Sequence, residues 1–175
     1  MKIRVRELTI AASCLALCLF LPSLTGHIPQ YGRAISPMHI PVLILGFLTG
    51  WPLALLVGLL APLLSFFLFG MPSLLPTGLA MMFELAAYGV AASLLRRAFP
   101  KNIGFLYASL ALSMLIGRAV WGIVSLVIAG IAGTEFTWAV FFASAFVKTL
   151  PGIVVHIAIV PPIVAGLRRA LRIAD

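Results

Sequence analysis

The sequence predicts an all-α integral membrane protein, built as a bundle of six transmembrane helices with both termini in the cytoplasm. Three observations support this prediction. Of the 175 residues, 63% are hydrophobic and only 9% are charged, whereas a soluble domain carries about 25% charged residues. The apolar residues form six runs, and a helix needs roughly 20 residues to cross a bilayer. Most basic residues flank these runs, as the positive-inside rule describes.

The first apolar run, at 8–25, follows three basic residues near the N-terminus. Signal peptides also begin with positive charge, but this run is long for one and no clear small-residue cleavage site follows it. We therefore expect a retained first helix. Cys14 and Cys18 lie one turn apart on it. With no metal-binding or disulfide partner nearby, we interpret both as small buried apolar side chains.

Pro, Gly and polar residues set the other boundaries. Gly50-Trp51-Pro52 is a turn signal after the second helix, which is short and begins with prolines. The segments GMPSLLPTG, PKN and GTEFT separate the later helices. We predict one membrane domain over residues 1–175. Its predicted helices span residues 8–25, 37–49, 52–69, 77–97, 103–131 and 137–167.

The distribution of charge fixes the predicted orientation. An even number of crossings puts both termini on one side, and nine basic residues then share that side, which should be cytoplasmic. The opposite loops hold only Arg33 and Glu135. The net charge of +8 therefore reflects membrane topology, and we expect no nucleic-acid partner. The nine residues are Lys2, Arg4, Arg6, Arg96, Arg97, Lys101, Arg168, Arg169 and Arg172.

Three ionisable residues fall inside the last three predicted helices: Glu84, Arg118 and Lys148. A charge in hydrocarbon costs about 2.5 to 3.5 kcal/mol or more unless it is paired or hydrated. At about 1.5 Å per residue, the three lie roughly 10, 20 and 16 Å from the outer ends of their helices. We expect Glu84 to face the bundle interior and to pair with Arg118 or Lys148.

Two interpretations of these charges are open. They form a buried ion pair that fixes helix register, or they line a polar pocket open to the outside. Two cations against one anion leave surplus positive charge, which suits a substrate carboxylate. Arg118 is the better candidate for bidentate capture.

Other candidates for the pocket follow from spacing. Tyr88 lies four residues after Glu84, and Trp121 lies three residues after Arg118, so each shares a helix face with its charge. His39 lies near the outer start of the second helix. Arg33, in the first loop with Tyr31, is a candidate lid residue. His156 lies deeper toward the cytoplasm and carries less weight.

No motif for chemistry is present. The chain has no phosphate-binding glycine loop, no HExxH and no GxSxG. We therefore predict no catalytic residue, no metal site and no cofactor in this chain. On the first helix, Ala12 and Ala16 are spaced so that another helix can approach closely, either within the bundle or from a partner.

These features resemble the substrate-binding membrane subunit, or S component, of an energy-coupling factor (ECF) vitamin transporter. The resemblance is carried by residues 36–89, with their SPMH, GMP and FELAAYG elements, and by MLIGRAVWGI at 114–123 and KTLPGIVVHIAIVPPIV at 148–164. Ala12 and Ala16 match the motif by which such subunits dock on a shared transmembrane coupling protein.

The resemblance implies a multi-pass protein of a prokaryotic cell membrane that captures a vitamin or related micronutrient near the outer face. It also implies a coupling membrane protein and two cytoplasmic ATPases, which hydrolyse the ATP, as partners. The substrate does not follow. Surplus positive charge favours an acid such as pantothenate, and queuosine precursors, pyridoxine, niacin and folate stay open.

Two alternatives come from other classes. One is an intramembrane enzyme that uses Glu84 as an acid or base, with His39 or His156 as its partner. The other is a structural or assembly protein whose buried charges only lock its helices together. Loss of ligand binding on Arg118→Ala, with the fold retained, would favour the S component over both.

Overall fold

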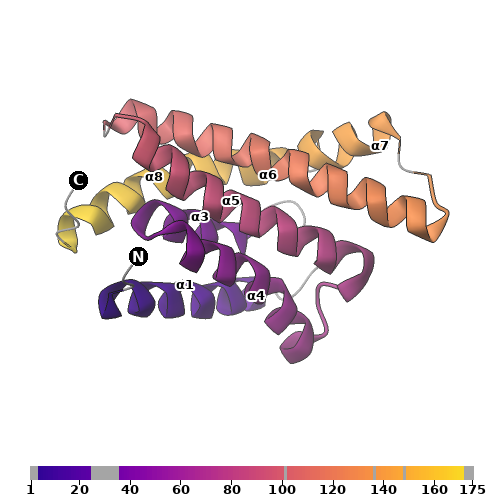
Figure 1. Ribbon diagram of the computed structural model, residues 1–175, viewed down its shortest axis with the longest axis horizontal. Helices are drawn as coiled ribbons and strands as arrows, with labels where there is room; N and C mark the ends of the chain where they lie inside the picture. Colours follow the sequence, from indigo (N-terminus) through magenta and orange to yellow (C-terminus); the bar gives the residue numbers. More distant parts are fainter. Residues whose placement is uncertain (1–3, 25–35, 101, 136, 148, 172–175) are drawn as a thin grey trace.

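The computed structural model of the chain describes residues 4–24, 36–100, 102–135, 137–147 and 149–171. Within these ranges every regular element is a helix, which confirms the predicted all-α class (Figure 1). The elements are α1 (Val5–Leu24), α3 (His39–Leu48), α4 (Trp51–Phe69), η1 (Leu74–Gly78), α5 (Leu79–Ala98), α6 (Ile103–Ala132), α7 (Trp138–Phe142), η2 (Ala143–Val147) and α8 (Leu150–Ala170).

Five described helical segments are long and apolar enough to cross a membrane. Two others are apolar but shorter, the predicted second helix and the region that comprises α7 and η2. The second helix is therefore short, as predicted from its apolar run. The five long segments are Val5–Pro22, Trp51–Phe69, Leu74–Ala98, Ile103–Ala132 and Leu150–Ala170.

The predicted continuous helix over 137–167 was wrong. The chain forms α7 and η2, and a new helix begins at Leu150 with Pro151 in its first turn. Proline has no N–H to donate, and its ring clashes with the carbonyl four residues earlier, so a helix does not run through it easily. Beside this break, the Thr149 hydroxyl donates a 2.7 Å hydrogen bond to the carbonyl oxygen of Ala145.

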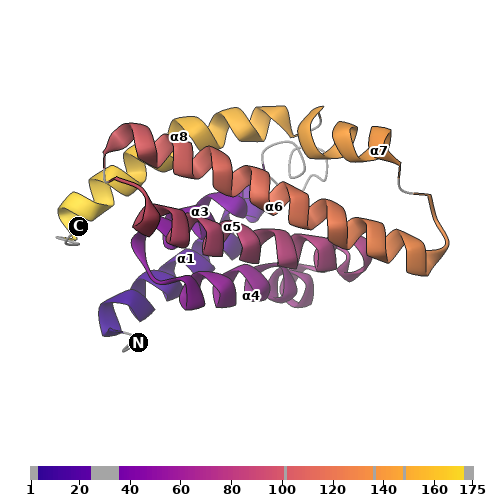
Figure 2. The same ribbon diagram turned by 45° about the horizontal axis from the view of Figure 1, so that its top comes forward.

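Helices α3 and α5 occupy the centre of the bundle. Nine of the ten residues of α3 are buried, because α1, α4, α5 and α8 all pack against it. Helix α5 lies between α4 and α6 and contacts both along its length (Figures 1 and 2). The core thus forms around a ten-residue helix, which at 1.5 Å per residue is only about 15 Å long, roughly half the thickness of the hydrocarbon region.

Small residues let these central helices approach closely. A Cβ atom added to Gly46 would lie 2.9 Å from the Cβ of Ala92, and one added to Gly89 would lie 2.9 Å from the Cβ of Ala54. Both separations are too short for real side chains. Close packing of this kind is a main source of helix association in lipid, where the hydrophobic effect between helices is weak.

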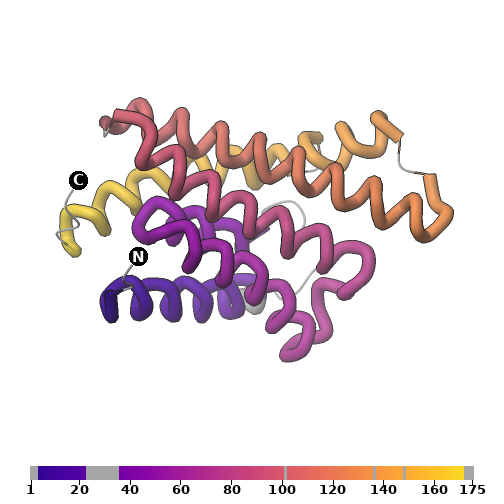
Figure 3. Tube along the Cα trace, viewed as in Figure 1, coloured from indigo at the N-terminus to yellow at the C-terminus, as the bar shows by residue number. Residues whose placement is uncertain are grey.

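The start of α1 and the end of α8 lie at the same end of the molecule (Figure 3). The Arg6 guanidinium donates a 3.1 Å hydrogen bond to the carbonyl of Leu171. Arg168 likewise donates to the carbonyl of Phe47, near the end of α3, at 3.1 Å. The turn between α5 and α6, which follows Arg96 and Arg97, lies at this end too (Figure 1).

Candidate functional site

Four helices bring polar side chains to one place in the apolar bundle. Glu84 is the sixth residue of α5, and His39 is the first residue of α3. Arg118 comes from the middle of α6, and His156 is the seventh residue of α8. All four side chains are buried. The sequence predicted that Glu84 would face the interior, and only 3% of its surface is exposed.

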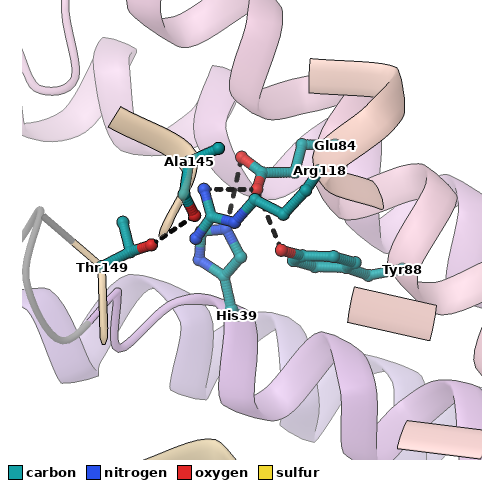
Figure 4. A network of polar contacts seen from close by, with 6 residues as sticks. All are labelled: His39, Glu84, Tyr88, Arg118, Ala145 and Thr149. Carbon is teal, nitrogen blue, oxygen red and sulfur yellow. Dashed lines mark hydrogen bonds and ion pairs between the residues drawn. The ribbon is translucent and has the colours of Figure 1, made fainter. Parts of the chain in front are cut away.

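The Glu84 carboxylate is the centre of the group (Figure 4). Its Oε1 lies 2.9 Å from Nη1 of Arg118 and accepts a 3.0 Å hydrogen bond from the Tyr88 hydroxyl. Its Oε2 lies 3.6 Å from Nε2 of His39. The predicted pairing of Glu84 with Arg118 is therefore present, and the predicted neighbour Tyr88 joins it. One carboxylate links α3, α5 and α6.

Tyr88 is held against the backbone of α6. A Cβ atom on Gly117 would collide with the Tyr88 ring, so the ring packs against the bare glycine, next to Arg118. Tyr88 also makes an edge contact with the His39 ring, at 5.3 Å between centroids. The glycine thus places the phenol where it can donate to Glu84.

Two histidines lie side by side on the α8 side of the group. The rings of His39 and His156 are stacked, with centroids 6.0 Å apart and planes inclined by 24°. Sequence reasoning gave His156 little weight because it placed His39 near the outer surface and His156 far below it. The packing of α3 against α8 places its first residue, His39, level with His156.

Several buried nitrogens in the group lack a hydrogen-bond partner among the described residues. They are Nε of Arg118 and both ring nitrogens of His39 and of His156, although Nε2 of His39 makes the longer contact with Glu84. Buried polar groups in folded proteins are nearly always hydrogen-bonded to protein or to ordered water. These nitrogens therefore call for hydrogen-bond partners that the described residues do not provide.

Trp121 belongs to a neighbouring aromatic cluster. Its ring stacks on Phe141 at 6.3 Å, and Phe141 packs against the backbone at Gly122, where a Cβ atom would collide with it. This aromatic cluster joins α6 to α7 and η2, one turn beyond Arg118. It comprises Trp121, Trp138, Phe141, Phe142 and Phe146.

Two predicted site residues, Arg33 and Lys148, lie outside the described residues. The surplus positive charge that the sequence suggested depends on Lys148, because Glu84 balances Arg118 within the described part of the site. Ala12 and Ala16 are both exposed on α1, and Cys14 and Cys18 are buried and unpaired as disulfides. Among the described residues, no three His, Cys, Asp or Glu side chains are placed to hold a metal ion.

A family model described as "ECF transporter, substrate-specific component" matches residues 6–164 of the chain. Comparison with curated proteins and with solved structures gave no match. Members of this family are multi-pass proteins of prokaryotic membranes, and they are transport subunits rather than enzymes. The family also implies partnership with the energising components of the transporter. Because the match covers most of the chain, this protein belongs to the substrate-specific component family of ECF transporters.

Proposed function

We propose that this S component captures an acidic vitamin or related micronutrient in a pocket near the outer face, where Arg118 receives the acid. The supporting observation is the buried group of Glu84, Arg118 and His39, in which polar nitrogens have no partner among the described residues. Arg118 donates to Glu84 through Nη1, and its buried Nε has no partner there. A guanidinium in that state can bind a second carboxylate.

Pantothenate is our first candidate substrate, because it joins a carboxylate to amide and hydroxyl groups within a small flexible molecule. Nicotinate and folate share the acid, whereas pyridoxine does not. In this proposal Lys148 and Arg33 also contribute positive charge toward the ligand. Tyr88 and Trp121 provide the adjoining aromatic surface.

The proposed topology has six crossings, with α3 as a short second span and the region from α7 to α8 as an interrupted sixth. It places both termini in the cytoplasm. Six described arginines support this orientation, because they flank helix ends that lie at one end of the bundle, as the positive-inside rule requires. They are Arg4, Arg6, Arg96, Arg97, Arg168 and Arg169.

We further propose that α1 docks on the transmembrane coupling protein through Ala12 and Ala16. Both are exposed, with Ala11 and Cys14 turned toward the core instead. A helix with small outward-facing residues one turn apart can pack closely against another helix. Two cytoplasmic ATPases complete the proposed transporter and supply its ATP hydrolysis, so this chain needs no cofactor.

The experiment is to purify the protein, to identify any co-purified small molecule by mass spectrometry, and to measure binding of pantothenate, nicotinate, folate and pyridoxine by calorimetry. Arg118→Ala leaves Glu84 without its cation and endangers folding. The second variant is therefore the uncharged pair Glu84→Gln with Arg118→Met. A hydrogen bond to a charged group contributes about 1.5 to 3 kcal/mol, so this pair should weaken binding of the acid roughly 10-fold to 150-fold.

An acid that binds the folded uncharged pair as tightly as it binds the wild-type protein would remove Arg118 from the pocket. If none of the four compounds binds and no small molecule co-purifies, the buried group of Glu84, Arg118 and His39 is only a lock between helices. In that case the variants change stability alone.

A further inference from the structure

His156 is a buried polar side chain whose ring nitrogens make no hydrogen bond within the described part of the chain. Only 2% of its surface is exposed, and neither ring nitrogen has a hydrogen-bond partner among the described residues. The backbone of Ser36 lies near the ring, but hydrogen-bond geometry is not met. A buried imidazole in this state is destabilising, and such a residue calls for a partner that the described residues do not supply.

Two side chains near His156 also have buried nitrogens that make no hydrogen bond to a described residue. Nδ1 of His39 and Nε of Arg118 are also buried without a partner among the described residues. The His39 ring is stacked on His156 and also reaches Glu84, which holds Arg118. Three helices, α3, α6 and α8, therefore contribute unsatisfied groups to one connected cluster.

We propose that His156 contacts the transported ligand and, together with His39, recognises a second polar group distinct from the acid that Arg118 receives. This inference rests on the proposed function and narrows its substrate class. An arginine Nε can only donate a hydrogen bond, so it selects an acceptor such as a carboxylate. A neutral imidazole has one donor and one acceptor, so it selects a group that both accepts and donates, or a ring nitrogen that pairs with its N–H.

The ligand class is therefore a small acid whose other end carries a hydroxyl, an amide or a nitrogen heterocycle. A metal ion is not the expected occupant, because no three His, Cys, Asp or Glu side chains of the described residues are placed to bind one. A buried water molecule is the competing occupant, since ordered water often satisfies such groups. Removal of the imidazole distinguishes the two occupants: it weakens ligand binding if the ligand contacts His156, and it lowers the stability of the ligand-free protein if a water molecule does.

The test replaces His156 with an apolar side chain of similar size, His156→Leu, and with an amide that keeps a donor and an acceptor, His156→Gln. The probes are pantothenate and nicotinate. Each is paired with an analogue of similar length or shape that keeps the acid and loses the other polar groups, octanoate for pantothenate and benzoate for nicotinate. Calorimetry gives the Kd of each, and thermal unfolding of the ligand-free protein gives Tm. Val154→Ala, an exposed change on the same helix, is the control.

We expect His156→Leu to weaken binding of the preferred acid at least 10-fold and to reduce its preference over the matched analogue below threefold. The Tm of the ligand-free protein should stay the same or rise, because an unsatisfied buried group has been removed. His156→Gln should keep part of the preference. Val154→Ala should change neither Kd nor Tm.

Two results would overturn the assignment of His156 and leave the proposed function standing. One is an unchanged Kd and preference in His156→Leu while the uncharged Glu84 and Arg118 pair loses binding. The other is a lower ligand-free Tm in His156→Leu with the preference retained, which is the behaviour of a histidine satisfied by water or backbone. If the wild-type protein binds neither acid, does not bind folate and carries no co-purified acid, the proposed function fails, and the role of His156 fails with it.

Discussion

The ion pair between Glu84 and Arg118 makes a prediction that does not depend on any ligand. Both side chains are buried, and Oε1 of Glu84 lies 2.9 Å from Nη1 of Arg118. We consider three variants: Glu84→Gln, Arg118→Met and the two together. Each single variant leaves one buried group without its partner, whereas the double variant removes both charges and keeps similar side-chain volumes.

The expected magnitudes follow from this geometry. Removing one partner of a buried ion pair destabilises a protein by about 3 to 5 kcal/mol, while replacing the whole pair with neutral groups is often close to neutral. Arg118→Met should fall at the lower end, because Tyr88 still donates to Glu84 and His39 still lies beside it. The double variant should lie within about 1 kcal/mol of wild type, so the two single effects are strongly non-additive.

The assay is thermal unfolding of the ligand-free protein in one detergent. A chain of this size changes Tm by about 2 to 4 °C per kcal/mol, so each single variant should lower Tm by roughly 6 to 20 °C. The double variant should recover most of that loss. If the two single shifts simply add in the double variant, the side chains do not interact, and the central contact of the site is wrong.

Two further predictions concern helix contacts. Replacing Ala12 and Ala16 with Leu should abolish co-purification of the coupling protein while leaving ligand binding unchanged, because both residues are exposed on α1. The matched control is Ala111→Leu, at an exposed alanine of α6. If the double variant still co-purifies with the complete transporter, docking at this face is refuted. Gly117→Ala should destabilise the protein by about 1 to 3 kcal/mol and weaken ligand binding, since the added methyl group collides with the Tyr88 ring. Gly130→Ala on the same helix, with no atom within 4 Å of the added carbon, should not lower Tm, and an equal loss in both variants would show that the Tyr88 contact is not the cause.

Most of the helices could be predicted from the sequence because lipid imposes a simple requirement. A crossing needs a long apolar run, and the residues that end such runs here are Gly and Pro. Gly70 and Gly133, for example, end α4 and α6 with positive φ values of 70° and 67°, which glycine adopts without strain. The one continuous helix that was wrongly predicted ran through Pro151. The apolar run continues across Pro151, so hydropathy alone gave no sign of a break. Because proline lacks an N–H and its ring clashes with the preceding turn, the chain starts a new helix there, with Pro151 in its first turn.

The site was predicted less completely, for a reason of geometry. Charge in an apolar helix is conspicuous, so Glu84 and Arg118 were identifiable, and Tyr88 followed from its spacing to Glu84. His156 was undervalued because depth was counted along each helix separately. Only packing sets how far α3 is sunk in the bundle, and packing places its first residue, His39, against His156. No spacing rule within α8 contains that information.

The two interpretations of the buried charges, a lock between helices and a receptor for an acid, are compatible in this geometry. Glu84 occupies Nη1 of Arg118, and an arginine carries five N–H donors in a rigid plane. The carboxylate therefore orients the guanidinium and leaves its Nε edge available. A ligand acid that binds at that edge does not need to break the ion pair, and it meets a cation whose orientation is already fixed. Such preorganisation reduces the entropy lost on binding. In the proposed function, the contact that joins α5 to α6 would therefore also strengthen the capture of an acid.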